Sequence, residues 1–194
     1  MATAPIPPLD RTQGMALVKL ARRTLAEALH IPWDLTEAEP LSTDPSLEEK
    51  QATFVTLKRQ GKLRGCIGTL LPVTTLRNSV KDNTFAAAFR DPRFNAVQSG
   101  EFDEIEIEIS LLTSPAPLAF DSPKALLMNL RTGLDGVIIK KGGASATFLP
   151  QVWEQIPNPE TFLSQLCLKA GLSKQAWQEP GLDVFTYQVQ YFHE

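Results

Sequence analysis

The chain has 194 residues, of which 43% are hydrophobic and 21% are charged, with a formal net charge of −3. This composition supplies enough apolar surface for a folded globular protein and excludes a disordered chain. The mild negative charge argues against a general nucleic-acid binder, because such a protein needs a basic face for phosphates. Two cysteines, Cys66 and Cys167, are too few for a disulfide scaffold. The sequence has no secretory signal pattern and no apolar run long enough to cross a membrane, so we expect a cytoplasmic protein.

The first half of the chain predicts two helices and a pair of strands. Apolar residues recur at helical spacing from Arg11, and Pro32 ends this helix. A turn at Gln60 and Gly61 separates two segments that predict strands. The expected elements are an irregular arm (1–11), the first helix, an acidic loop or flap (34–48), two strands (53–57 and 62–70) and a second helix (75–90).

The second half contains the clearest pattern, a strict alternation of apolar and polar residues over 104–111, which predicts a half-buried antiparallel strand. Two tryptophans and a cysteine lie on apolar sides of short helices and are expected in the core: Trp153, Trp177 and Cys167. The remaining expected elements are a short helix (122–130), a hairpin (136–141 and 144–149), a helix capped by Asn158 (to 171) and a final strand (184–192).

The strands come as hairpins rather than as strand-helix-strand crossovers. The sequence therefore predicts an α+β fold with a mainly antiparallel sheet flanked by helices. We expect residues 12–194 to form one domain, preceded by the arm.

Groups that would hold a metal or cofactor are scarce in this sequence. The only histidines, His30 and His193, have no cysteine or carboxylate at the spacing of a zinc site. No glycine-rich phosphate loop is present. Two cysteines cannot bind an iron–sulfur cluster. We therefore predict no cofactor and no metal.

The segment Leu63-Arg64-Gly65-Cys66-Ile67-Gly68, called the 63–68 motif below, is unusual for a strand because it holds two glycines. On a regular strand Arg64 and Cys66 share a face, and a nearby guanidinium favours the thiolate form of a cysteine. Cys66 is then a candidate nucleophile. The alternative is a cysteine that only packs, and a bulge at Gly65 would remove the shared face.

Two further sets of residues are candidates for the site. Arg93, in the turn after the second helix, either binds an anion or caps carbonyl groups, and Asp91 is expected to be a turn residue. Glu106 and Glu108 form an i, i+2 carboxylate pair. They act as an acid or base if they face a cleft, are solvated if they face water, or pair with Arg64 or Arg93 across the sheet.

The 63–68 motif resembles the signature of the AMME-syndrome critical-region protein family, the AMMECR domain. The similarity extends over roughly residues 12–193, and the other matching segments are 54–57, 87–94, 107–112, 148–152 and 162–177. The compact chain most resembles the prokaryotic type, AmmeMemoRadiSam system protein A. This resemblance implies an α+β fold with a larger and a smaller lobe, with the motif near the cleft between them. It also implies a Memo-like protein and a radical SAM enzyme as partners.

Two functions remain open on this evidence. In the first, which we favour, the chain is a binding or adaptor module that uses Leu63, Gly65, Ile67, Gly68 and Arg93. In the second, it is an enzyme or enzyme subunit with Cys66 as the nucleophile, Arg64 as its activator, and Glu106 or Glu108 moving protons. The sequence does not reveal a substrate or an oligomeric state.

Overall fold

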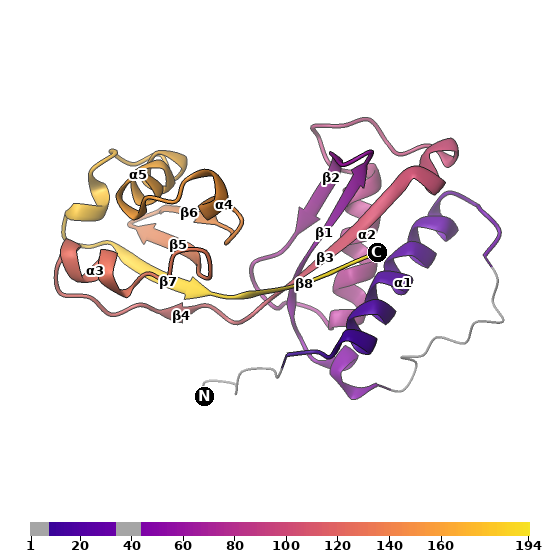
Figure 1. Cartoon of the computed structure of the whole chain (residues 1–194), viewed down its shortest axis with the longest axis horizontal. Helices are drawn as coiled ribbons and strands as arrows, with labels where there is room; N and C mark the ends of the chain where they lie inside the picture. The colour runs from indigo at the N-terminus through magenta and orange to yellow at the C-terminus, as the bar shows by residue number, and fades with distance from the viewer. Residues whose placement is uncertain (1–7, 34–43) are drawn as a thin grey trace. The chain divides into compact units, whose positions relative to one another are not determined.

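The computed structural model describes residues 8–33 and 44–194, which divide into two compact units (Figure 1). The first unit contains the described residues up to Ser114 together with Gln190–Glu194, and the second contains Pro115–Val189. Each unit has its own four-stranded sheet and its own apolar core. The chain therefore enters the second unit at Pro115 and returns to the first after Val189.

The sheet of the first unit has the strand order β2-β1-β3-β8, and β1 pairs antiparallel with both β2 and β3. Helices α1 and α2 pack against one face of this sheet, where their apolar residues meet those of the strands. The elements are α1 (Arg11–Ala28), β1 (Ala52–Arg59), β2 (Lys62–Gly68), α2 (Leu76–Phe89), β3 (Ile105–Leu112) and β8 (Val189–His193), with short 3₁₀ turns η1 (Pro45–Glu48) and η2 (Ser99–Glu104).

Local sequence signals fix the ends and the register of these elements. The Asp10 side chain accepts from the Gln13 amide and begins α1 with a capping box, and the Thr75 side chain accepts from the Asn78 amide at the start of α2. Gln60 and Gly61 both have positive φ, of 53° and 71°, as a tight hairpin turn between β1 and β2 requires. The predicted turn at these two residues is therefore confirmed.

The second unit contains an antiparallel sheet in the order β4-β7-β5-β6 and three α-helices among its described residues. Trp153 stacks on Phe162 with 3.6 Å between ring centroids, and its Nε1 donates to the carbonyl of Asp135. Trp177 and Cys167 are also buried, so all three predicted core residues are confirmed. The elements are β4 (Ala116–Pro117), α3 (Pro123–Asn129), β5 (Gly136–Lys141), β6 (Ala144–Phe148), α4 (Val152–Gln155), α5 (Pro159–Lys169), η3 (Ala176–Gln178) and β7 (Asp183–Tyr187).

The α+β fold with antiparallel sheets flanked by helices is confirmed, but the final strand was predicted wrongly. Residues 184–192 do not form one strand: β7 belongs to the sheet of the second unit and β8 to that of the first. The apolar pattern continues through the break because both halves are strands. Most of the expected acidic loop (34–43) and the start of the arm (1–7) lie outside the described residues. Within the described residues, no helix is long and apolar enough to span a membrane.

Candidate functional site

The 63–68 motif forms most of β2, which lies at the edge of the described sheet. Its register against β1 shifts by one residue, because Leu57 pairs with Gly65 whereas Lys58 pairs with Leu63. Arg64 is the extra residue of this bulge. The regular alternation that would place Arg64 and Cys66 on one face is therefore interrupted at Arg64.

The two glycines of the motif make room for other parts of the chain. A Cβ at Gly65 would lie 2.1 Å from the carbonyl oxygen of Ala87, so α2 packs directly against the strand. A Cβ at Gly68 would lie 2.3 Å from the ring of Phe54, its partner on β1. Glycines within a strand often mark a place where another group approaches the main chain closely. Here the groups that approach are parts of the chain itself, a helix carbonyl at Gly65 and an aromatic ring at Gly68.

The guanidinium of Arg64 is bound by groups of the following loop and turn. Its Nε and Nη2 donate to the two carboxylate oxygens of Glu101 at 2.9 and 3.0 Å, and its Nη1 donates to the Asn95 carbonyl at 2.9 Å. These bonds from Arg64 lower the pKa of Glu101 to about 2, with the Gln98 amide adding to the effect. Arg64 therefore fixes the loop between α2 and β3 to the motif strand.

Asp91 and Arg93 form a second clamp on the same strand. The amide of Cys66 donates to Asp91 Oδ2 at 2.9 Å, and Arg93 Nη2 donates to the Cys66 carbonyl at 3.3 Å. The two side chains are joined to each other by bonds of 2.9 and 2.7 Å. This binding to Arg93 holds the pKa of the buried Asp91 well below its usual range. The pair takes the place of a neighbouring strand, since it satisfies both outward-facing backbone groups of Cys66.

The Cys66 thiol lies on the sheet face opposite the helices. It accepts a hydrogen bond from the Thr56 hydroxyl at 3.3 Å, and Thr56 pairs in register with Glu108 on β3. Cys66 and Glu108 are therefore two strands apart, or roughly 9.5 Å between backbones. Glu108 is bound to Lys58 at 3.0 Å, and Glu106 is exposed. Neither Arg64 nor Arg93 pairs with these glutamates among the described residues, so that predicted alternative is wrong.

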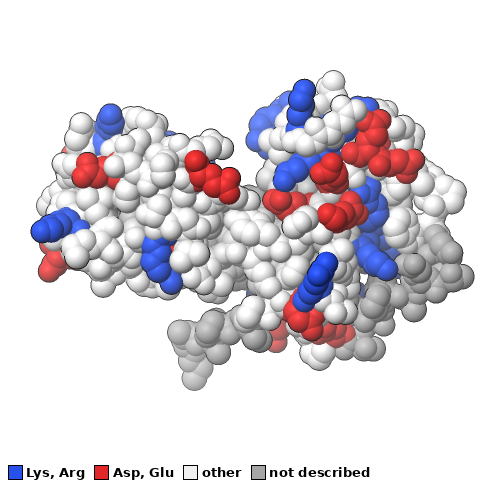
Figure 2. Space-filling view, in the orientation of Figure 1, with Lys and Arg blue, Asp and Glu red and all other residues white. Residues whose placement is uncertain are grey.

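Basic side chains near the motif are largely matched by acidic ones. Lys58 pairs with Glu108, and Arg59 binds Glu104 as well as Glu101. Figure 2 shows acidic and basic side chains intermingled over the part of the molecule that carries β1 and β2. Such an arrangement lacks the uniform positive field that attracts phosphate backbones.

Sequence reasoning missed three members of this site. Glu101 and Asn95 follow Arg64 by 37 and 31 residues in the sequence. Nothing in their local sequence indicates that they bind Arg64. Thr56 lies in a strand that was predicted, but only the register reveals that it faces Cys66. The structure brings Cys66 together with Asp91 and Arg93, and not with the two predicted glutamates.

Comparisons with known proteins give a consistent result over nearly the whole chain. The matching family model is AMMECR1, over residues 18–192. A protein of Methanothermobacter thermautotrophicus is 37% identical over 198 residues, which cover 96% of this chain and 97% of that protein. A protein of Thermofilum pendens is 39% identical over 201 residues, with coverages of 96% and 92%.

A solved structure supports the same conclusion. The crystal structure of an uncharacterized protein from Pyrococcus horikoshii aligns with a TM-score of 0.83 at 34% identity. The alignment covers 96% of this chain and 93% of that chain. The similarity thus includes both units.

Proposed function

The chain belongs to the AMMECR1 family, and on this premise we propose that it acts as a binding or adaptor component rather than as a catalyst. Its partners in this proposal are a Memo-like protein and a radical SAM enzyme, as in the AmmeMemoRadiSam arrangement, where it would be the system protein A. It would contact them through the 63–68 motif. The enzyme of the set would then supply the chemistry.

The observation that carries this proposal is that the polar groups around the motif are already engaged. Arg64 uses Nε, Nη1 and Nη2 on Glu101 and Asn95, and both oxygens of Asp91 are bound by Arg93. Each guanidinium nitrogen of Arg64 and each carboxylate oxygen of Asp91 thus already has a partner within the chain. The internal bonds produce a rigid surface, which lowers the entropy cost of docking.

Side chains suited to an interface are exposed on the motif strand, on the turn after α2 and on α2 itself. Leu63 is 44% exposed, and the Arg93 side chain is 55% exposed. On α2, Phe85 is exposed, packs on Phe89 and lies under the guanidinium of Arg90. Aromatic and arginine side chains contribute most of the binding energy in many protein interfaces.

The test compares two exposed apolar positions. Leu63→Glu changes the motif strand, whereas Met128→Glu makes a similar change on α3 of the second unit, where Met128 is 75% exposed. We expect Leu63→Glu to weaken binding of the purified Memo-like or radical SAM protein by about tenfold or more, and Met128→Glu to leave it unchanged. Calorimetry measures both. Unchanged binding by Leu63→Glu would remove the motif as the docking site.

A second candidate function uses Cys66 as a nucleophile. The observation in its favour is that the thiol is half-buried rather than enclosed, and lies on the face that the helices do not cover. Cys167 is fully buried, so alkylation of the folded chain reports on Cys66 alone. Rapid alkylation, together with loss of activity in Cys66→Ala in a reconstituted three-protein assay, would favour this function. Full activity of Cys66→Ala would exclude it.

A further inference from the structure

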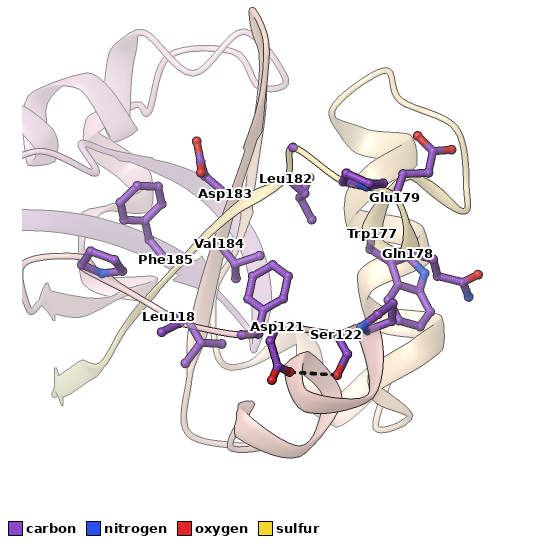
Figure 3. A pocket seen from close by; sticks show the side chains of 16 residues that line it. Leu118, Asp121, Ser122, Trp177, Gln178, Glu179, Leu182, Asp183, Val184 and Phe185 are labelled. Carbon is purple, nitrogen blue, oxygen red and sulfur yellow. Dashed lines mark hydrogen bonds between the residues drawn. The ribbon is translucent and has the colours of Figure 1, made fainter.

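The first unit buries three polar side chains between β1 and α2, whereas the carboxylates that line a groove of the second unit are exposed. That groove lies between residues 117–123 and 177–185 and has a volume of about 510 Å³ (Figure 3). Its three carboxylates are all exposed, and Glu179 is already bound to Lys141. Exposed charges stay solvated and specify no ligand. A buried polar group destabilises the fold unless it is hydrogen-bonded, so its partners show what it holds in place.

The buried polar side chains are Thr53 on β1 and Ser79 and Asn83 on α2, called the 53–79–83 cluster below. They belong to residues that are 0%, 2% and 6% exposed. The hydroxyls of Thr53 and Ser79 lie 2.7 Å apart and share a hydrogen bond. Asn83 Nδ2 donates to the Thr53 hydroxyl at 2.8 Å and to the Thr53 carbonyl at 3.2 Å, and it lies 3.3 Å from Ser79 Oγ. The cluster therefore bonds α2 to the strand that lies beside the motif strand.

The Thr53 carbonyl connects this cluster to the end of the motif strand. It accepts a second hydrogen bond, at 2.9 Å, from the amide of Thr69, the residue that follows Gly68. A Cβ at Gly68 would lie 2.3 Å from the same carbonyl oxygen, so the strand passes close to it. One oxygen thus joins the side chain of Asn83 to the main chain at the end of β2.

The cluster acts on the motif strand from the side of the helices. The bonds described above hold the strand at Arg64 and Cys66, whereas the cluster holds it where it ends, at Thr69. Thr53 shares a face of β1 with Val55, which belongs to the core of the first unit. Because its members are buried in this way, the cluster cannot touch a bound protein. Any effect that it has on binding must pass through the motif strand.

We propose that Asn83 is a positioning residue for docking, which fixes the end of the 63–68 motif so that the strand is already ordered when a partner binds. This inference rests on the adaptor function proposed above. Buried polar side chains that are hydrogen-bonded to one another make a single arrangement of the chain rigid. A surface ordered in advance loses less entropy on docking. Replacing Asn83 should therefore weaken partner binding although no side chain of the docking surface is changed.

The first test measures partner binding and amide exchange in the full chain with Asn83→Leu, which removes the amide donor and keeps a side chain of similar size. Calorimetry with the purified Memo-like protein should show binding weaker by about fivefold or more, since the end of the strand must then be ordered on docking. Amide exchange at Thr69 should be faster. The matched control is Thr84→Val. Thr84 is also buried on α2, but its hydroxyl donates to the Val80 carbonyl of its own helix at 2.7 Å, so both readouts should keep their wild-type values.

A second variant separates positioning from stability. Thr53→Val/Ser79→Ala/Asn83→Leu replaces the whole cluster by apolar side chains, and removing all partners together should keep stability near that of the wild type. Partner binding should still be weaker by about fivefold or more, while urea denaturation checks that the chain is folded. Wild-type affinity in both Asn83 variants would overturn the proposal. So would a loss of affinity that only follows the unfolded fraction. A wild-type chain that does not bind the partner would instead contradict the adaptor function itself.

Discussion

The two units each contain a buried aspartate bound to a half-exposed arginine, but the two pairs have different structural roles. In the second unit, Asp135 accepts from the amide and the guanidinium of Arg131, four residues before it. In the first unit, Asp91 binds Arg93 and also accepts from the amide of Cys66, 25 residues away. The aspartate side chains are 1% and 2% exposed, and the arginines are 56% and 55% exposed.

This difference shows that the same ion pair closes a local turn in one unit and joins two distant segments in the other. The Asp135 pair lies within residues 131–135, so its removal affects the turn before β5. The Asp91 pair lies between the loop after α2 and the motif strand, and Arg93 adds a bond to the Cys66 carbonyl. The Asp91 carboxylate therefore holds the motif strand directly, whereas the recorded side-chain bonds of Asp135 all come from Arg131 in its own turn.

The largest expected effect on stability comes from substituting a glycine in β2 of the first unit or in β5 of the second. Gly65→Ala places a Cβ 2.1 Å from a backbone carbonyl oxygen of α2, whereas Gly136→Ala places one 2.4 Å from the ring of Tyr187, a side chain rather than backbone. We expect Gly65→Ala to destabilise the first unit by about 3 kcal/mol or more, and Gly136→Ala to cost the second about 1–2 kcal/mol. Urea denaturation followed by hydrogen exchange measures each unit. Equal costs would contradict the packing described for α2 on β2.

The next largest loss of stability should come from substituting the two buried aspartates. Asp91→Ala and Asp135→Ala each leave buried donors unsatisfied, and we expect each to cost about 2–3 kcal/mol. Only Asp91→Ala should accelerate amide exchange at Cys66, by about tenfold or more, because its carboxylate accepts that hydrogen. Unchanged exchange at Cys66 would show that the clamp does not hold the motif strand.

Acid should weaken the first unit through Glu101. Its pKa is lowered from 4.5 in the unfolded chain to about 2 in the folded one, so the stabilisation is complete above pH 4.5 and is lost as the pH falls toward 2. Asp91, also with a lowered pKa, contributes in the same direction. In Glu101→Gln the free energy of unfolding should be lower at neutral pH and should fall less steeply on acidification. A wild-type slope in this variant would contradict the role of the Arg64–Glu101 pair.

The smallest effect is expected at the predicted glutamates. Glu108 pairs with a half-exposed Lys58, and such pairs contribute about 0–1 kcal/mol. Glu108→Gln should therefore change stability by less than about 1 kcal/mol and leave partner binding intact. A severe loss of activity in this variant would instead favour the enzyme function with Cys66.

The sequence was sufficient to predict most of the elements, because their signals are local. The alternation over 104–111, the caps of the helices and the Gln60-Gly61 turn each act within a few residues. The partners of Arg64 could not be predicted, because Glu101 and Asn95 reach it only through the path of the loop between α2 and β3. The two glycines mark the 63–68 motif as unusual in the sequence, but only the packing of α2 shows that Ala87 approaches Gly65.

The strand at 184–192 illustrates the same limit. Its residues have the pattern of a single strand, yet the chain leaves one sheet and joins another between Tyr187 and Val189. Strand propensity does not say which sheet a strand joins, since that choice depends on distant partners.

Hydrogen exchange of the chain with and without the proposed Memo-like partner tests the adaptor function most directly. If the motif strand is the docking site, binding should slow exchange in β2 and in residues 91–95, with no change in α3 or α5. Protection confined to the second unit, or no protection with the partner bound, would contradict the proposal that the 63–68 motif is the surface through which this chain acts.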